Sequence, residues 1–220
     1  IHHKSIKDAY SVGAFEKDAI EKLNILHSSK NVVVMVGGSG LYVNAVLKGF
    51  DEFPKIATEM RAQLNQELES KGLEFLQKEL KRLDPKSYET IAIKNPHRVI
   101  RALDICRGTG QPYTSFLNKH KAQRNFKIIP IGLKAERSLI YERINNRVDQ
   151  MIESGLLEEA KSVFNYRKLN ALNTVGYKEL FNYFEGQWTL EFAISEIKKN
   201  TRRFAKRQMT WFQKDTETQW

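Results

Sequence analysis

Helical spacing of apolar residues dominates the pattern of this chain. Between residues 10 and 28, Val12, Phe15, Ala19 and Leu23 recur every three or four positions, which predicts a helix with one apolar face. The same spacing predicts further helices over residues 41–47, 58–70, 73–83, 85–91, 96–107, 136–154, 156–166, 175–184 and 190–212. The chain is therefore predicted to be mostly α-helical.

Two short apolar runs have the composition of buried strands instead. The first covers residues 32–36 and leads through Gly37-Gly38-Ser39-Gly40 into a helix, an order that is typical of an α/β unit. The second covers residues 126–132, with Pro130 at a position where a strand would end. Because two strands alone do not make a sheet, we expect an α/β core whose other strands lie outside the given sequence.

The same patterns predict two domains. Residues 58–118 contain no strand-like alternation, so we expect residues 51–125 to form an all-helical insertion domain. Residues 1–50 and 126–220, on either side, are expected to form the core domain. The sequence opens at Ile1 with neither an initiator methionine nor a signal-peptide pattern, which we interpret as a cut inside a longer protein.

Composition narrows the class of protein. There are 36 Lys and Arg against 26 Asp and Glu, giving a net charge of +10 and a pI near 9.6, which is compatible with a polyanionic partner such as nucleic acid. No apolar run approaches the roughly 18 residues of a membrane-spanning helix. Cys106 is the only cysteine, which excludes an intrachain disulfide and fits a reducing cytoplasm. The five histidines show no metal-binding spacing, so no metal site is predicted within this chain.

The predicted helix at 190–212 carries a stripe of cations. At about 100° per residue, six basic side chains share half of its circumference without an interleaved carboxylate. They are Lys198, Lys199, Arg202, Arg203, Lys206 and Arg207. A solvated face would explain the stripe, and so would a phosphate-rich ligand that relieves the repulsion between its charges. On the opposite, apolar side stand Thr201 and Gln208, whose polar groups must find hydrogen-bond partners.

Two further features could bind an anion. The turn Gly37-Gly38-Ser39-Gly40 precedes a helix, so its amide groups could hold a phosphate, although a tight turn with Ser39 as a helix cap explains it equally well. It matches neither a dinucleotide-binding pattern nor a hydrolase pattern. Arg143 and Arg147 lie one turn apart on the helix that follows the second predicted strand. Ion pairs with nearby carboxylates, those of Glu136, Glu142 or Asp149, are the alternative role for these two arginines.

Several stretches, taken in order, resemble the tRNA dimethylallyltransferase family, also called tRNA isopentenyltransferases. Two of them are Val36-Gly-Gly-Ser-Gly-Leu-Tyr42 and Arg98-Val-Ile-Arg-Ala-Leu103. The others cover residues 8–19, 142–151, 155–159, 175–179 and 201–211. Each stretch is weak alone, but the ordered set spans nearly the whole chain.

The resemblance implies a P-loop-NTPase-like three-layer α/β core with an all-helical insertion. It also implies transfer of a dimethylallyl group from dimethylallyl diphosphate to N6 of the adenosine adjacent to the anticodon in tRNA. The expected partners are the tRNA anticodon stem-loop, dimethylallyl diphosphate and Mg²⁺, whose ligands are expected mostly outside this sequence. A cytoplasmic monomer that does not bind membranes is expected.

The resemblance also assigns roles to residues. Ser39 stands where the family usually has threonine, and it and Arg147 are the expected catalytic residues. Diphosphate binding is expected at Gly37, Gly38, Ser39, Arg147 and Arg202. Contacts with tRNA are expected at Arg61, His97, Arg98, Arg101, Thr174, Gly176, Tyr177, Lys178, Lys206, Arg207 and Gln208.

One departure from the family pattern concerns activity. The family's phosphate-binding loop and the aspartate expected to act as general base do not occur in this sequence. We therefore expect these 220 residues alone to be inactive in transfer. Two alternatives remain open: an isopentenyltransferase that acts on free adenine nucleotides, and a non-catalytic RNA-binding module.

Overall fold

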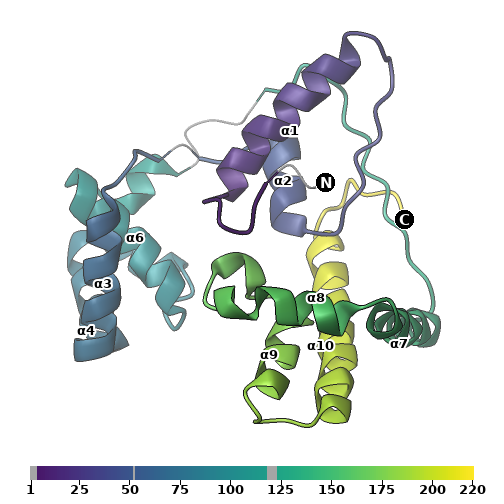
Figure 1. Cartoon of the computed structure of the whole chain (residues 1–220). Coiled ribbons are helices and arrows are strands. Elements are labelled where there is room, and N and C mark those ends of the chain that lie inside the picture. The colour runs from purple at the N-terminus through teal and green to yellow at the C-terminus, as the bar shows by residue number, and fades with distance from the viewer. Residues whose placement is uncertain (1–3, 52, 118–122) are drawn as a thin grey trace. The chain divides into compact units, whose positions relative to one another are not determined.

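Helices make up the regular structure of this chain. The computed structural model describes residues 4–51, 53–117 and 123–220, and over these ranges the predicted helices are confirmed (Figure 1). They are α1 (Val12–His27), α2 (Gly40–Lys48), α3 (Thr58–Lys71), α4 (Leu73–Leu83), α5 (Pro85–Thr90), α6 (Pro96–Thr109), α7 (Arg137–Glu153), α8 (Leu156–Val163), α9 (Tyr177–Phe184) and α10 (Leu190–Phe212). Single 3₁₀ turns are η1 (Tyr113–Phe116), η2 (Phe164–Tyr166) and η3 (Asn170–Leu172). None of the described helices is both long and apolar enough to cross a bilayer.

The two predicted strands are wrong for the described residues. Residues 32–36 and 126–132 form no strand, and the second segment makes only an isolated bridge between Ile131 and Gln219. Their apolar side chains are exposed rather than buried, with Val34 at 78% and Val36 at 91% exposure. The physical reason is that an extended segment becomes a strand only by hydrogen bonding to a neighbouring strand, and no described segment supplies one.

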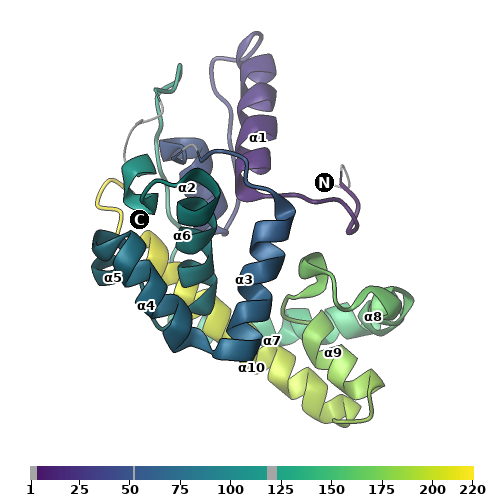
Figure 2. The ribbon, with the colours of Figure 1, turned by 90° about the vertical axis from the view of Figure 1, so that its left-hand side faces the viewer.

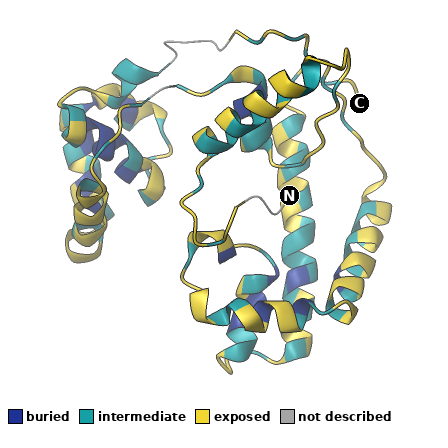
Figure 3. Ribbon diagram, turned by 45° about the horizontal axis from the view of Figure 1, so that its top comes forward, coloured by how far each residue is buried: buried dark blue, intermediate teal, exposed yellow. Residues whose placement is uncertain are grey.

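The chain divides into two compact units, which are described separately. The first comprises residues 1–47 and 124–220, and the second comprises residues 48–123. Each has its own buried core, visible as dark blue ribbon in Figure 3.

The second unit is a cluster of short helices around α6, seen in Figure 2. Its core combines Leu64 of α3 and Leu76 and Leu80 of α4 with Leu103 of α6, all with no exposed surface. Burial of each such side chain contributes about 1.5–3 kcal/mol. The packing of this core fixes α6 within the unit, and with it the basic residues that α6 carries.

A buried carboxylate joins two parts of this second unit. Asp84, 1% exposed, accepts hydrogen bonds from the amide groups of Ser87 at 3.0 Å and Thr114 at 2.8 Å, as well as from both hydroxyls. It therefore caps α5 and ties η1 to it. Burial alone would raise the pKa of Asp84, but these hydrogen bonds outweigh it and lower the pKa below its usual value.

In the first unit, α7 to α10 form the core. Val148 of α7, Leu156 of α8, Leu180 of α9 and Ile197 of α10 are packed together. The buried Glu179 accepts from the amide of Gly176 and the side chain of Asn200, each at 2.8 Å, so that the start of α9 is tied to α10. Gly176 has a φ of +104°, which explains why α9 begins at Tyr177 and not at residue 175 as predicted.

The helices α1 and α2 are held together by Arg124. Its guanidinium donates to the carbonyls of Ala45 and Val46 at 2.8 Å each and pairs with Glu16 of α1 at 2.6 Å. A cation at the carbonyl end of α2 is favourable because those carbonyls lack intrahelical donors. The glycine turn, residues 37–40, therefore leads into a helix that Arg124 links to α1.

Candidate functional site

The cationic stripe of α10 divides into two halves. In the first half, Nζ of Lys198 lies 2.6 Å from Oδ1 of Asp149 on α7, and Nη1 of Arg202 donates to Oδ1 of Asn145 at 2.7 Å. Lys199 likewise pairs with a glutamate of its own helix. Exposed cations without a carboxylate partner among the described residues make up the second half, and they are Arg203, Lys206 and Arg207. Lys198 and Lys199 are thus neutralised by carboxylates, whereas Arg202, bonded to a neutral amide, and the three exposed cations of the second half keep their charge.

The polar residues on the apolar side of α10 have partners, as predicted. The hydroxyl of Thr201 donates to the carbonyl of Ile197 at 2.7 Å, within the helix. The side-chain amide of Gln208 reaches outside the helix and donates to the carbonyl of Gly38 at 2.7 Å. Gln208 was expected to contact tRNA, and the structure places its amide against the glycine turn.

The glycine turn packs against the last turns of α10. Gly38 and Gly40 leave room for the side chains of Gln208 and Trp211, and a methyl group on either glycine would overlap the side chain opposite it. Ser39, between them, is exposed, and its carbonyl accepts from the amide of Val43 to begin α2. Ser39 is therefore an exposed residue of a turn whose flanking glycines pack against α10.

Arg147 is exposed on α7 and has no carboxylate within ion-pair distance in the parts of the chain that the structure describes. Arg143, one turn before it, is in the same situation. The alternative role of these arginines is wrong for the described residues, because no ion pair joins either of them to Glu136, Glu142 or Asp149, and Asp149 pairs with Lys198 instead. Both arginines remain available to an anionic ligand.

Both candidate elements attach to α10. The helix α7 meets it at Lys198 and Arg202, whereas the glycine turn meets it at Gln208 and Trp211. Arg202 and Gln208 are six residues apart, which is about 9 Å along a helix axis. The α10 helix is thus the common support of the elements that carry Arg147 and Ser39 (Figure 1).

In the second unit, a set of basic residues lies on α3 and at the start of α6. Arg61, His97 and Arg98 are exposed there. Asn95 caps α6 by accepting from the amide of His97 at 3.0 Å, which satisfies an amide of the first turn that has no partner within the helix. These residues, expected to contact tRNA, are accessible.

Arg101 is held more firmly than its neighbours. Its guanidinium lies 4.8 Å from the ring centre of Phe53, and Phe53 stacks on Tyr113 at 5.1 Å. On the same helix Asp104, 4% exposed, approaches Nη1 of Arg101 to 3.6 Å. Sequence reasoning missed Phe53 and Asp104, although an aspartate within the apolar run 102–106 was a signal that could have been used.

The segment 174–178 is partly engaged inside the protein. Thr174 and Lys178 are exposed, but Gly176 is buried and its amide donates to Glu179. The hydroxyl of Tyr177 donates to Glu159, and burial together with this hydrogen bond raises the pKa of Tyr177 to about 12. Glu179 was not singled out from the sequence, yet its buried carboxylate fixes the start of α9.

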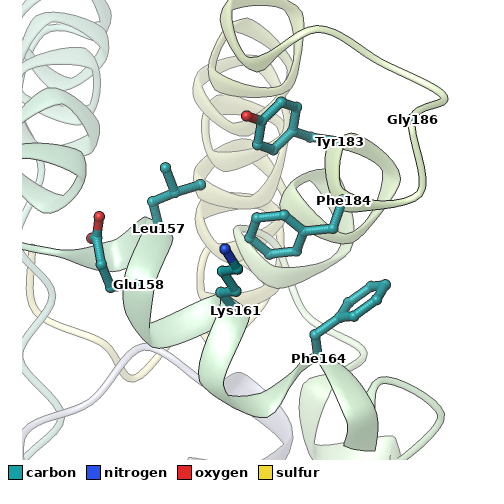
Figure 4. Close-up of a pocket in the computed structure, with 7 residues that line it drawn as sticks. All are labelled: Leu157, Glu158, Lys161, Phe164, Tyr183, Phe184 and Gly186. Atoms are coloured by element: carbon teal, nitrogen blue, oxygen red, sulfur yellow. The ribbon is translucent and has the colours of Figure 1, made fainter.

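A cavity of about 560 Å³ lies between α8 and α9. Lys161, Phe164, Tyr183 and Phe184 line it, as Figure 4 shows. It contains none of the residues expected to bind a substrate.

The described residues form a helix-rich protein with exposed basic side chains on α3, α6, α7 and α10, and comparison with known proteins specifies its class. Residues 1–215 match the family model described as IPP transferase. The tRNA dimethylallyltransferase of Christiangramia forsetii is 61% identical over 220 residues, which cover all of this chain and 73% of that protein. That of Flavobacterium johnsoniae is 52% identical over 226 residues, with coverages of 100% and 73%.

Solved structures agree with the sequence comparison. The full-length tRNA isopentenylpyrophosphate transferase from Bacillus halodurans superposes with a TM-score of 0.66 at 38% identity, covering all of this chain and 69% of that one. The chain belongs to the IPP transferase family.

Proposed function

We propose that this protein transfers a dimethylallyl group from dimethylallyl diphosphate to N6 of the adenosine adjacent to the anticodon in tRNA. The observation that carries the proposal is the family match over residues 1–215, joined to 61% identity with a tRNA dimethylallyltransferase along the entire chain. The exposed cations support it, because both the tRNA and the diphosphate are polyanions.

The reaction is a substitution at an allylic carbon. The N6 nitrogen forms a bond to C1 of the dimethylallyl group, the bond from C1 to the diphosphate oxygen breaks, and its electron pair leaves with the diphosphate. The N6 proton passes to a base, which we expect outside this sequence. Because negative charge grows on the leaving group, fixed donors and cations aimed at it lower the barrier.

We assign two groups of residues to diphosphate binding. They are Gly37, Gly38 and Ser39 of the glycine turn, and the arginines Arg147 and Arg202. Arg147 is an exposed cation without an internal carboxylate partner among the described residues, so an anionic ligand would not have to displace one. Arg202 uses one nitrogen on Asn145 and retains further donors for the ligand. Ser39 is proposed to lie near the reacting amine on the basis of the family resemblance, and its exposure on a turn that packs against α10 is compatible with this role.

Binding of the tRNA anticodon stem-loop is proposed on both units. The first unit contributes Lys206 and Arg207 on α10 and Thr174 and Lys178 before and within α9, all exposed. The second contributes Arg61, His97, Arg98 and Arg101. Phosphate contacts position an RNA without reading its sequence, and Arg101 stacked on Phe53 adds a planar cation that is suited to an unstacked base.

Two finer features rest on the resemblance. We propose that the complete protein has a P-loop-like core to which residues 32–36 and 126–132 contribute; their exposed valines and isoleucines support this. Mg²⁺ is proposed as a cofactor, but the described residues offer no group of three His, Cys, Asp or Glu side chains that could hold an ion.

A direct assay tests the proposal. The complete gene product is incubated with dimethylallyl diphosphate, Mg²⁺ and unmodified tRNA, and the nucleosides are analysed by mass spectrometry for N6-dimethylallyladenosine, with AMP as a competing acceptor. Transfer to tRNA but not to AMP is expected. Transfer to AMP alone would favour a nucleotide transferase, and tight tRNA binding without any transfer would favour an RNA-binding module.

A further inference from the structure

The glycine turn and the last turns of α10 are in contact at two points. At the first, the side-chain amide of Gln208 donates to the carbonyl of Gly38 at 2.7 Å, across 170 residues of sequence. At the second, the indole of Trp211 occupies the space next to Gly40 that a side chain would need. Gln208 and Trp211 are three residues apart and therefore lie on neighbouring positions of one helix face.

Gly38 and Gly40 are explained by the lack of space for a side chain, and not by an unusual backbone conformation. Neither Gly38 nor Gly40 is among the glycines with positive φ, so another residue could adopt their backbone angles. A methyl group on Gly38 would overlap the amide of Gln208, and one on Gly40 would overlap the ring of Trp211. Glycine at each position thus allows the backbone of the turn to approach a side chain of α10 closely: Gln208 at Gly38 and Trp211 at Gly40.

Ser39 lies between the two contacts. Its neighbours on either side are held against α10, while its own hydroxyl is exposed. The exposed cations Arg203, Lys206 and Arg207 stand on the same last turns of α10. A single rigid helix therefore supports the turn with one face and presents cations with another.

We propose that Gln208 and Trp211 are positioning residues: they fix the backbone of the glycine turn, and with it Ser39, relative to the cationic face of α10. The proposal rests on the proposed function for the identity of the two ligands, and it replaces the expectation that Gln208 contacts tRNA. Its consequence is that loss of the Gln208 amide lowers the rate of transfer while leaving tRNA affinity intact.

The first experiment compares Gln208→Leu with Gln150→Ala, which truncates an exposed glutamine on α7. Gln208→Leu is expected to lower kcat roughly 10- to 100-fold, since small misplacements of reacting groups cost this much, with the tRNA dissociation constant within twofold of wild type. Gln150→Ala is expected to match wild type. A Gln208→Leu enzyme with normal kcat and strongly weakened tRNA binding would overturn the proposal and restore the tRNA-contact role.

The second experiment is independent of activity. Thermal unfolding and amide hydrogen exchange are measured for Gly38→Ala, Gln208→Ala and the double variant. Gly38→Ala is expected to lower Tm and speed exchange over residues 37–43, and Gln208→Ala should suppress much of that effect because it removes the overlapping amide. Strictly additive effects would show that the two residues do not interact and would overturn the proposal. If coupling is present but wild type transfers nothing to tRNA, the positioning contact stands and the proposed function fails.

Discussion

Nη1 of Arg101 lies 3.6 Å from Oδ2 of Asp104, and the other oxygen of this buried carboxylate has no hydrogen-bond partner among the described residues. A buried acceptor left unpaired costs free energy, so Asp104 is not explained by stability. Its one charged contact is Arg101, whose guanidinium also lies over the ring of Phe53, so we expect Asp104 to help orient this arginine.

Replacement of Asp104 should therefore separate stability from binding. Asp104→Asn is expected to leave the free energy of unfolding of the second unit unchanged or to raise it by about 1 kcal/mol, because the cost of a buried charge disappears. The tRNA dissociation constant should rise about two- to fivefold, the size expected for a pair whose arginine is partly exposed. Filter binding and urea unfolding measure the two quantities. Unchanged binding with a large loss of stability would assign Asp104 a purely structural role.

Replacement of Asp84, in contrast to that of Asp104, should lower the stability of the second unit. Asp84→Asn is expected to destabilise the second unit by about 2–4 kcal/mol at pH 7, because a fully buried acceptor of several hydrogen bonds loses its charge. Glu89→Gln, at an exposed position of α5, is the matched control and should change the free energy by less than about 0.5 kcal/mol. Circular dichroism in urea measures both variants.

The same carboxylate predicts a dependence on pH. The pKa of Asp84 is lowered in the folded state, so its contribution to stability is present above the ordinary aspartate pKa and is lost as pH falls through the folded pKa. Wild type should thus lose more stability than Asp84→Asn when the pH is taken from 7 to about 3. Parallel pH profiles for the two proteins would contradict the assignment.

Arg147 should act on the rate. Arg147→Ala in the complete protein is expected to lower kcat about 100- to 1,000-fold, the loss typical of a donor to developing negative charge, with little change in tRNA affinity. Arg143→Ala, one turn away and equally exposed, is the control that retains activity. Steady-state kinetics at saturating tRNA distinguish the two. Normal turnover at saturation together with a large loss of tRNA binding by Arg147→Ala would move this residue to the RNA surface.

The two halves of the α10 stripe should differ in salt dependence. Lys206→Ala is expected to weaken tRNA binding and to reduce the slope of log K against log salt concentration by about 1, as removal of one phosphate contact does. Lys198→Ala should change the slope less, because Asp149 already neutralises Lys198. Filter binding at several salt concentrations checks both. Equal slopes for the two variants would mean that the ion pair with Asp149 opens when tRNA binds.

What could be predicted from the sequence was local in origin. A helix forms from hydrogen bonds four residues apart, so apolar spacing located the starts of α6 and α10 to the residue, and the structure adds their caps, Asn95 and Thr189. The need of Gln208 for a partner also followed from its place on the apolar side of α10. The resemblance to a family could be recognised for the same reason, since it rests on short stretches in order.

Only the tertiary structure decided which partners those residues have. The segments 32–36 and 126–132 read as strands, but pairing is a property of a neighbour, and no described segment provides one. The stripe on α10 reads as uniform, yet Asp149 and Asn145, about 50 residues earlier in the chain, engage one half of it. Gln208 meets Gly38 across 170 residues. The periodic pattern of apolar residues determines where helices form, because helical hydrogen bonds are local. Contacts between distant segments depend on how the helices pack, and the spacing of residues along the chain does not specify this packing.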